Sequence, residues 1–180
     1  MRESEKNNLW EWIKSILVAV LLALLIRAFI VEVFLVEGRS MLPTLDDGER
    51  LLVSKIQYYY RKPEIGEIVV FKATENKDYI KRVIAGAGDE VLVDRDGVYV
   101  NGRKLVEPYI TEEHKEPYGP VIVPEDTVFV LGDNRNNSLD SRNPYVGFVS
   151  LDRIKGKAMF VFWPIKRMRL LSHGEGKLHD

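Results

Sequence analysis

A serine lies in the segment VEGRSMLPTLDDGE, residues 36–49, where a polar turn containing proline follows an apolar stretch. A serine hydroxyl is a poor nucleophile unless a neighbouring base takes its proton. Histidine is the usual base, and the chain has three, His114, His173 and His179. All three fall in polar loop or tail segments, so Ser40 needs another partner. A neutral lysine amine is the chemical alternative.

A lysine acts as a base only where burial lowers its pKa, because water stabilises the charged form. Lys72 ends the expected strand IVVFK, where we expect it to be exposed, whereas Lys81 falls in the middle of DYIKRVIAGAGDEV. In a strand, Lys81 shares a face with Tyr79 and Arg82 points to the opposite face. Alternation does not decide which face is inward. Arginine keeps its proton in proteins, so Lys81 is the candidate base, with a solvated strand lysine as the ordinary alternative.

A third polar stretch, VLGDNRNNSLDSRNP, covers residues 130–144 and follows an apolar run. Its four charged residues can pair with one another, and its serines add hydroxyl groups; the charged residues are Asp133, Arg135, Asp140 and Arg142. At a surface such pairs contribute little. A buried and fully satisfied network would instead fix the position of a catalytic group.

Composition narrows the classes of function. The chain has 180 residues, a net charge of −1 and no cysteine. The length suits one compact domain with an appendage, and the charge argues against nucleic acid as a partner. Without cysteine there is no thiol nucleophile, thiolate zinc site or disulfide. We expect neither a metal nor a cofactor.

The N-terminal segment has the composition of a membrane anchor. Residues 16–26 are apolar without a break, and Trp10 and Trp12 precede them. Residues 10–26 would form a helix of about 25 Å, the lower limit for crossing a bilayer. Bulky residues follow instead of a small-x-small cleavage site, which predicts a retained anchor. Lys14 and the basic residues before it favour a cytoplasmic N-terminus. A buried helix of a soluble domain is the alternative.

The rest of the chain reads as strands, from FIVEVFLVE through IVVFKA and DTVFVLGD to KGKAMFVFWPI. DEVLVDRDGVYVNGRKLV predicts hairpins turning at Asp96-Gly97 and Asn101-Gly102. The predicted fold class is mainly β, an antiparallel β-sheet catalytic domain with one N-terminal transmembrane helix. The expected organisation is a cytoplasmic flank over 1–9, an anchor over 10–30, an extracytoplasmic β-rich domain over 31–170, and a polar tail over 171–180.

Together these stretches resemble bacterial type I signal peptidase, a membrane-bound serine peptidase that removes signal peptides. The resemblance covers nearly the whole chain in the family's order: the anchor, then GRSMLPTL, GERLLVSK, GEIVVFK with DYIKRVIAGAGD, and GDNRNNSLDSR. It implies that Ser40 is the nucleophile and Lys81 the general base. It also implies a hydrogen bond from Ser138 to the lysine amine and an ion pair between Asp140 and Arg142, with Asp133 in the same supporting element.

The resemblance further implies secretory preproteins as substrates, cut at the membrane surface after a small-x-small motif, with membrane lipids as partners and no nucleic acid. Two shallow apolar pockets would select the small residues. Their expected lining is Phe34, Val36, Met41, Leu45, Tyr79 and Ile80. These residues are equally typical of ordinary core packing.

One position departs from the family pattern. Some members have a serine two residues before the nucleophile, whose hydroxyl helps to hold the oxyanion, and this chain has Gly38 there. The oxyanion would then depend on the backbone N–H of Ser40. Near the C-terminus, MFVFWPIKRMRLL combines Trp163 with basic residues and predicts contact with an anionic interface, or simply a last core strand with a solvated tail.

Two other readings stay open. The same serine–lysine pair occurs in self-cleaving repressor-like proteins and in plasmid-transfer processing peptidases. Repressor relatives would need an N-terminal DNA-binding domain, and the predicted anchor argues against them. A catalytically silent, membrane-tethered binding domain is a reading of another class, which requires Ser40 and Lys81 to be individually dispensable.

Overall fold

The computed structural model of the chain describes residues 2–110 and 116–171, with residues 2–9 and 26–28 described by their backbone alone. The three histidines discussed above, His114, His173 and His179, fall outside the described residues. The predicted polar tail over 171–180 also lies outside them, apart from its first residue.

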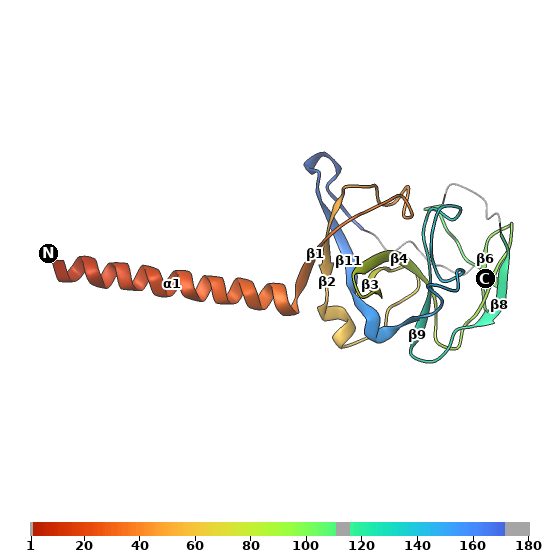
Figure 1. The fold of residues 1–180 in the computed structure, drawn as a ribbon, viewed down its shortest axis with the longest axis horizontal. Helices are drawn as coiled ribbons and strands as arrows, with labels where there is room; N and C mark the ends of the chain where they lie inside the picture. The colour runs from red at the N-terminus through yellow and green to blue at the C-terminus, as the bar shows by residue number, and fades with distance from the viewer. Residues whose placement is uncertain (1, 111–115, 172–180) are drawn as a thin grey trace.

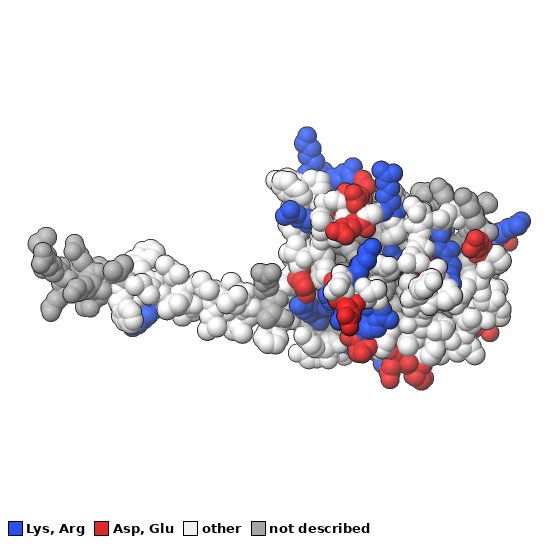
Figure 2. All heavy atoms as spheres, in the orientation of Figure 1, with Lys and Arg blue, Asp and Glu red and all other residues white. Residues whose placement is uncertain are grey.

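The N-terminal segment forms one helix, α1 (Arg2–Phe29), which projects away from a β-rich body (Figure 1). Its described side chains from Trp10 to Leu25 are exposed, and few charged groups interrupt them (Figure 2). In the part of the chain that the structure describes, no helix is both long and apolar enough to cross a bilayer. The helix is therefore confirmed, whereas the transmembrane segment predicted over residues 10–30 is not.

The body contains a large antiparallel sheet in which neighbouring strands run β1-β2-β11-β3-β4-β9-β10, with β12 also pairing with β11. The strands are β1 (Val31–Leu35), β2 (Arg50–Ser54), β3 (Ile68–Thr74), β4 (Lys77–Gly86), β9 (Thr127–Leu131), β10 (Val149–Ser150), β11 (Ile154–Trp163) and β12 (Arg169–Leu170). This arrangement confirms the mainly β, antiparallel prediction.

A smaller antiparallel sheet, in the order β7-β6-β5-β8, is inserted between β4 and β9. Its strands are β5 (Glu90–Val93), β6 (Val98–Val100), β7 (Arg103–Lys104) and β8 (Tyr118–Ile122). The hairpin turns lie where the sequence predicts them. Asn101 and Gly102 have φ angles of 53° and 75°, the doubly positive combination that a two-residue type I′ turn requires and that Asn-Gly favours.

Some short elements were not predicted. Residues 57–67, interpreted as an irregular connector, begin within a 3-10 helix, η1 (Ile56–Tyr59). Two further 3-10 turns are η2 (Leu151–Arg153) and η3 (Ile165–Arg167). The strands β10 and β12 contain only two residues each, too few to show any periodicity. The strand β11, interpreted as the last, is followed by β12.

The core explains how two adjacent basic residues of β4 are both buried. One cluster packs the small sheet against one side of β4 and β9 through Ile84 and Leu131. A second cluster covers the opposite side through Val83 and Val130. Both faces of β4 are therefore covered from Lys81 to Ala85, and the expectation that only one face points inward is wrong.

Candidate active site

Ser40 and Lys81 meet at the centre of the large sheet. The Nζ of Lys81 lies 2.7 Å from the Oγ of Ser40, and it donates a second hydrogen bond of 3.0 Å to the carbonyl of Ile80. Ser40 follows β1 in a tight turn, whereas Lys81 lies in the middle of β4. Residues 41 positions apart are thus brought within hydrogen-bonding distance.

The environment of Lys81 suits a base. Lys81 is only 4% exposed, and its Nζ lies 5.3 Å from the ring centroid of Tyr79. Burial lowers the pKa of Lys81 to about 8, against the opposing effect of the carboxylates of Asp140 and Asp133, while the charge of Lys77 adds to the lowering. About a tenth of the lysine is therefore neutral one pH unit below that pKa.

This environment leads to a prediction for pH dependence. Only neutral Lys81 accepts a proton, and its fraction grows as the pH rises through about 8. We expect kcat/KM for peptide cleavage to rise about tenfold per pH unit on the acid side and to level off above the pKa. Initial rates measured on one peptide across the pH range test this. A profile that is flat from about pH 6 to pH 9 would contradict it.

The turn that carries Ser40 is held on both sides. The amide of Asn134 donates to the carbonyl of Ser40 at 3.0 Å, and the hydroxyl of Thr44 donates to Asp133. The amide of Gly38 is already occupied, because it donates to the side chain of Asp47 at 2.7 Å. Among the described residues, no hydrogen bond engages the amide of Ser40. That N–H is therefore available to a ligand.

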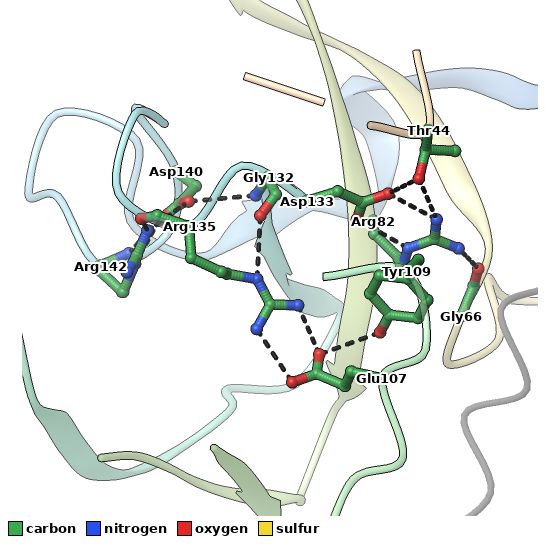
Figure 3. A network of polar contacts seen from close by, with 10 residues as sticks. All are labelled: Thr44, Gly66, Arg82, Glu107, Tyr109, Gly132, Asp133, Arg135, Asp140 and Arg142. Carbon is green, nitrogen blue, oxygen red and sulfur yellow. Dashed lines mark hydrogen bonds and ion pairs between the residues drawn. The ribbon is translucent and has the colours of Figure 1, made fainter. Parts of the chain in front are cut away.

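A buried polar network lies next to this pair, and Figure 3 shows the network without Ser40 and Lys81. The carboxylate of Asp140 pairs with Arg142, with a nitrogen–oxygen distance of 2.9 Å, and accepts the amide of Gly132 at 3.1 Å. Asp133 does not pair with Arg135 inside the polar loop. It binds Arg82 through two hydrogen bonds of 2.9 and 2.6 Å. The four charged residues of the loop thus belong to a buried network, not to a surface turn.

The guanidinium of Arg135 pairs instead with Glu107, from the segment that follows β7. Both side chains are almost fully buried. The stacking of Tyr109 against Arg82 completes this part of the network, with the guanidinium carbon 3.8 Å from the ring centroid. None of Arg82, Glu107 and Tyr109 was a predicted site residue. The only signal for Arg82 was its position beside Lys81.

An open groove leads to the pair of Ser40 and Lys81. It has a volume of about 420 Å³ and runs between β1 with the Ser40 turn and the first half of β4. Five of the six residues predicted to line the substrate pockets are found there, namely Phe34, Val36, Met41, Tyr79 and Ile80. Leu45 is not. It is completely buried in the core cluster behind the groove, so its role there is packing.

Comparison with known proteins identifies the family. The family model described as signal peptidase, peptidase S26, matches residues 9–163. The chain belongs to this signal peptidase family. A signal peptidase I of Bacillus licheniformis is 47% identical over 177 residues, 92% of this chain and 95% of that relative. The signal peptidase I T of Bacillus subtilis is 46% identical over 178 residues, 93% of this chain and 92% of that relative.

A solved signal peptidase I from Enterococcus faecalis is 31% identical, matching 54% of this chain and 97% of that one with a TM-score of 0.45. Membership of the signal peptidase family makes the chain a serine endopeptidase. The alternative of a catalytically silent binding domain is therefore set aside.

One expectation carried over from the signal peptidase family is not met. Ser138 was expected to hydrogen-bond the amine of Lys81, yet its buried Oγ has no partner among the described residues. It lies beside the site nonetheless, because a Cβ built on Gly132 would overlap both Ser138 Oγ and the carbonyl of Ser40. The hydrogen bonds of the amine go instead to Ser40 Oγ and to the carbonyl of Ile80.

Proposed function

We propose that the chain is a membrane-bound signal peptidase that cleaves signal peptides from secreted preproteins after a small-x-small motif, with Ser40 as nucleophile and Lys81 as general base. The observation that carries the proposal is the 2.7 Å approach of Lys81 Nζ to Ser40 Oγ. The burial of Lys81 supports it, because the amine must be neutral to accept a proton.

In the acylation step, the neutral amine of Lys81 accepts the proton of the Ser40 hydroxyl while Oγ attacks the scissile carbonyl. The amide of Ser40 donates to the resulting oxyanion, a role for which no competing hydrogen bond exists among the described residues. Protonated Lys81 then gives its proton to the leaving amine as the carbon–nitrogen bond breaks. An acyl-enzyme remains on Ser40.

Deacylation repeats the same proton transfers. Neutral Lys81 removes a proton from water, which attacks the ester carbonyl, and the protonated amine returns the proton to Ser40 as the ester bond breaks. Asp133 and Asp140 lie near enough to favour the ammonium form. Together with Arg82 and Arg142, their charge partners, we assign them a supporting role.

The pairing of β4 supports an extended substrate. Among the described residues, its first half, residues 77–81, pairs only with β3, because β9 begins to pair at Arg82. The opposite flank of the groove is β1, the terminal strand of the sheet. A peptide backbone that enters the groove thus meets unpaired strand edges and adds to the sheet as an extra strand. The apolar side chains along the groove then face its small residues.

We also propose that α1 attaches the enzyme to the cell membrane, with the N-terminus cytoplasmic and the catalytic domain outside. The exposed and uninterrupted apolar side chains from Ile16 to Leu25 support this. Wild-type chain in cell membranes should resist extraction by alkaline carbonate, and protease added outside the cell should degrade the β-rich domain. Release by carbonate would contradict attachment through the bilayer.

A second membrane contact is predicted on the large sheet. Residues paired across neighbouring strands have their side chains on the same face of the sheet. The pairing of β1, β2, β11 and β12 aligns one row of such residues, Val33, Leu52, Phe160 and Leu170, and beside it a second row, Leu35, Arg50 and Trp163. Most of these side chains are exposed, and Trp163 is 49% exposed. A chain starting at Val31 should bind anionic vesicles, and Trp163→Ala should weaken binding about fivefold, as loss of an interfacial apolar side chain does. Unchanged binding would remove this face from the membrane contact.

The proposed function is tested by cleavage of a preprotein in detergent–lipid micelles, followed by sequencing of the N-terminus of the product. We expect a single cut after a small-x-small motif. The same preprotein with a bulky residue immediately before the cut should not be cleaved there. Cleavage at unrelated sites, or cleavage that persists in Ser40→Ala, would refute the proposed function.

A further inference from the structure

Residues 105–110, which follow β7, reach from the small sheet to the polar network behind Ser40 and Lys81. Two of these residues, Glu107 and Tyr109, lie between the guanidinium groups of Arg135 and Arg82 in Figure 3. Neither lines the substrate groove, and neither forms a hydrogen bond with Ser40 or Lys81. Any influence on the reaction must therefore pass through other residues.

The first connection runs from Glu107 to the turn beside Ser40. Two nitrogens of Arg135 donate to the carboxylate of Glu107, and the side chains are 0% and 3% exposed, respectively. The Nε of Arg135 also donates to the carbonyl of Gly132 at 3.0 Å. Gly132 packs against the carbonyl of Ser40. Glu107 therefore holds the turn that supports the nucleophile.

The second connection runs from Tyr109 to the strand of the base. Its ring lies 3.8 Å from the guanidinium carbon of Arg82, the residue that follows Lys81. Its hydroxyl donates to Glu107 at 3.0 Å. Burial, and then the charge of Glu107, raise the pKa of Tyr109, so the hydroxyl remains a donor. Stacking on Tyr109, pairing with Asp133 and a hydrogen bond of 2.8 Å to the carbonyl of Gly66 together fix the guanidinium of Arg82.

We propose that Glu107 and Tyr109 are positioning residues for Ser40 and Lys81, acting as one clamp through Arg135 and Arg82. The inference rests on the proposed function, because it assumes the serine–lysine pair. The clamp holds the nucleophile turn and the base strand from a single segment of the small sheet. Misplacing reacting groups by about 1 Å costs on the order of 100-fold in rate, so a support of this kind affects kcat without touching substrate.

The clamp also controls the electrostatics at Lys81. The charged groups that act on its amine are Asp140 and Asp133, which favour the charged form, and Lys77, which opposes it. Arg82 balances Asp133 only while it stays in place. Displacement of Arg82 exposes Lys81 to an uncompensated carboxylate and admits water. Both changes favour ammonium, so the acid limb of the pH profile moves to higher pH.

The test compares full-length Tyr109→Leu, Tyr109→Phe and Glu107→Gln with wild type on one peptide substrate in detergent–lipid micelles. Tyr109→Leu removes ring and hydroxyl, and we expect kcat to fall about 30-fold, the equivalent of a desolvated cation–π contact. The KM should stay within about twofold, because no substrate contact is lost. Tyr109→Phe keeps the ring and should lose less. Tyr99→Leu, on β6 of the same sheet and outside the clamp, is the matched control.

The decisive measurement is the pH at the midpoint of the acid limb of the kcat/KM profile. A midpoint shifted upward in Tyr109→Leu and Glu107→Gln, with Tyr99→Leu unshifted, supports positioning. If activity falls only in proportion to the folded fraction and the midpoint does not move, the clamp contributes to stability alone and the inference is overturned. A rise in KM with no change in kcat also overturns it. Should Tyr109→Leu not fold, the midpoints of Tyr109→Phe and Glu107→Gln decide. Activity retained by Ser40→Ala refutes the proposed function itself, whereas normal clamp variants beside inactive Ser40→Ala refute only this inference.

Discussion

Lys81→Met is expected to abolish cleavage while leaving the fold intact. Methionine has nearly the length of lysine and is apolar, so it fits the buried site without an unpaired charge. The substitution removes the only basic nitrogen within hydrogen-bonding distance of Ser40 Oγ among the described residues. We expect kcat to fall by about 10⁴- to 10⁶-fold, as it does when serine peptidases lose one member of the catalytic set. Cleavage of a preprotein, followed over hours at pH 8 to 9, measures the loss.

Lys72→Met is the control, because Lys72 is exposed on the neighbouring strand β3 and does not line the groove. It should cleave at the wild-type rate. Lys81→Arg adds a second test, since arginine keeps the charge but does not release its proton. That variant should be as inactive as Lys81→Met. Cleavage by folded Lys81→Met within tenfold of wild type would show that another group is the base.

Gly132→Ala is expected to produce the second large loss. A Cβ at this position would overlap Ser138 Oγ and the carbonyl of Ser40, so both must move. Overpacking of this kind costs about 1–3 kcal/mol of stability, and displacement of the nucleophile turn should lower kcat about 100-fold. Thermal unfolding and single-turnover cleavage measure the two effects separately.

Gly86→Ala is a matched control on β4, where an added Cβ finds its nearest neighbour, Asp89 Oδ2, at 3.9 Å. It should retain activity and unfold near the wild-type temperature. If Gly132→Ala loses stability but keeps the kcat of wild type, the turn tolerates the displacement, and the position of Ser40 is less constrained than its contact with Gly132 indicates.

Local pattern was sufficient to predict much of the fold. Short runs of apolar residues, many of them β-branched or aromatic, marked β3, β4, β9 and β11, and the Asn101-Gly102 turn marked a hairpin, because these signals are contained within a few residues. Single-sequence reasoning also selected Lys81, since arginine was chemically excluded as a base. It did not predict that Lys81 and Arg82 are both buried. That result depends on a small sheet inserted after β4, which packs against the large one.

The partners in the polar network could not be predicted from residues near one another in the sequence. The charged residues of the loop from Asp133 to Arg142 were expected to pair among themselves, yet Asp133 pairs with Arg82 and Arg135 with Glu107. Nothing near Glu107 in the sequence distinguishes it from an exposed acidic residue. Its role follows only from the three-dimensional approach of the small sheet. Likewise, the position of Ser138 in its motif did not predict that its Oγ has no hydrogen-bond partner among the described residues. That outcome depends on packing.

Strand β4 has an open edge along its first half, and this edge limits which peptide bonds of a substrate the enzyme can cleave. In the proposed substrate complex, the open edge of residues 77–81 pairs only with a backbone that has no hydrogen-bonding partners of its own. In a segment already folded into a helix or a sheet, the N–H and C=O groups are hydrogen-bonded to each other. Such a segment cannot pair with β4, whatever its side chains. Small residues in a folded domain are thus protected by their own secondary structure. Under the proposed pairing, the conformation of the substrate, and not its sequence alone, would distinguish a leader segment from a mature protein.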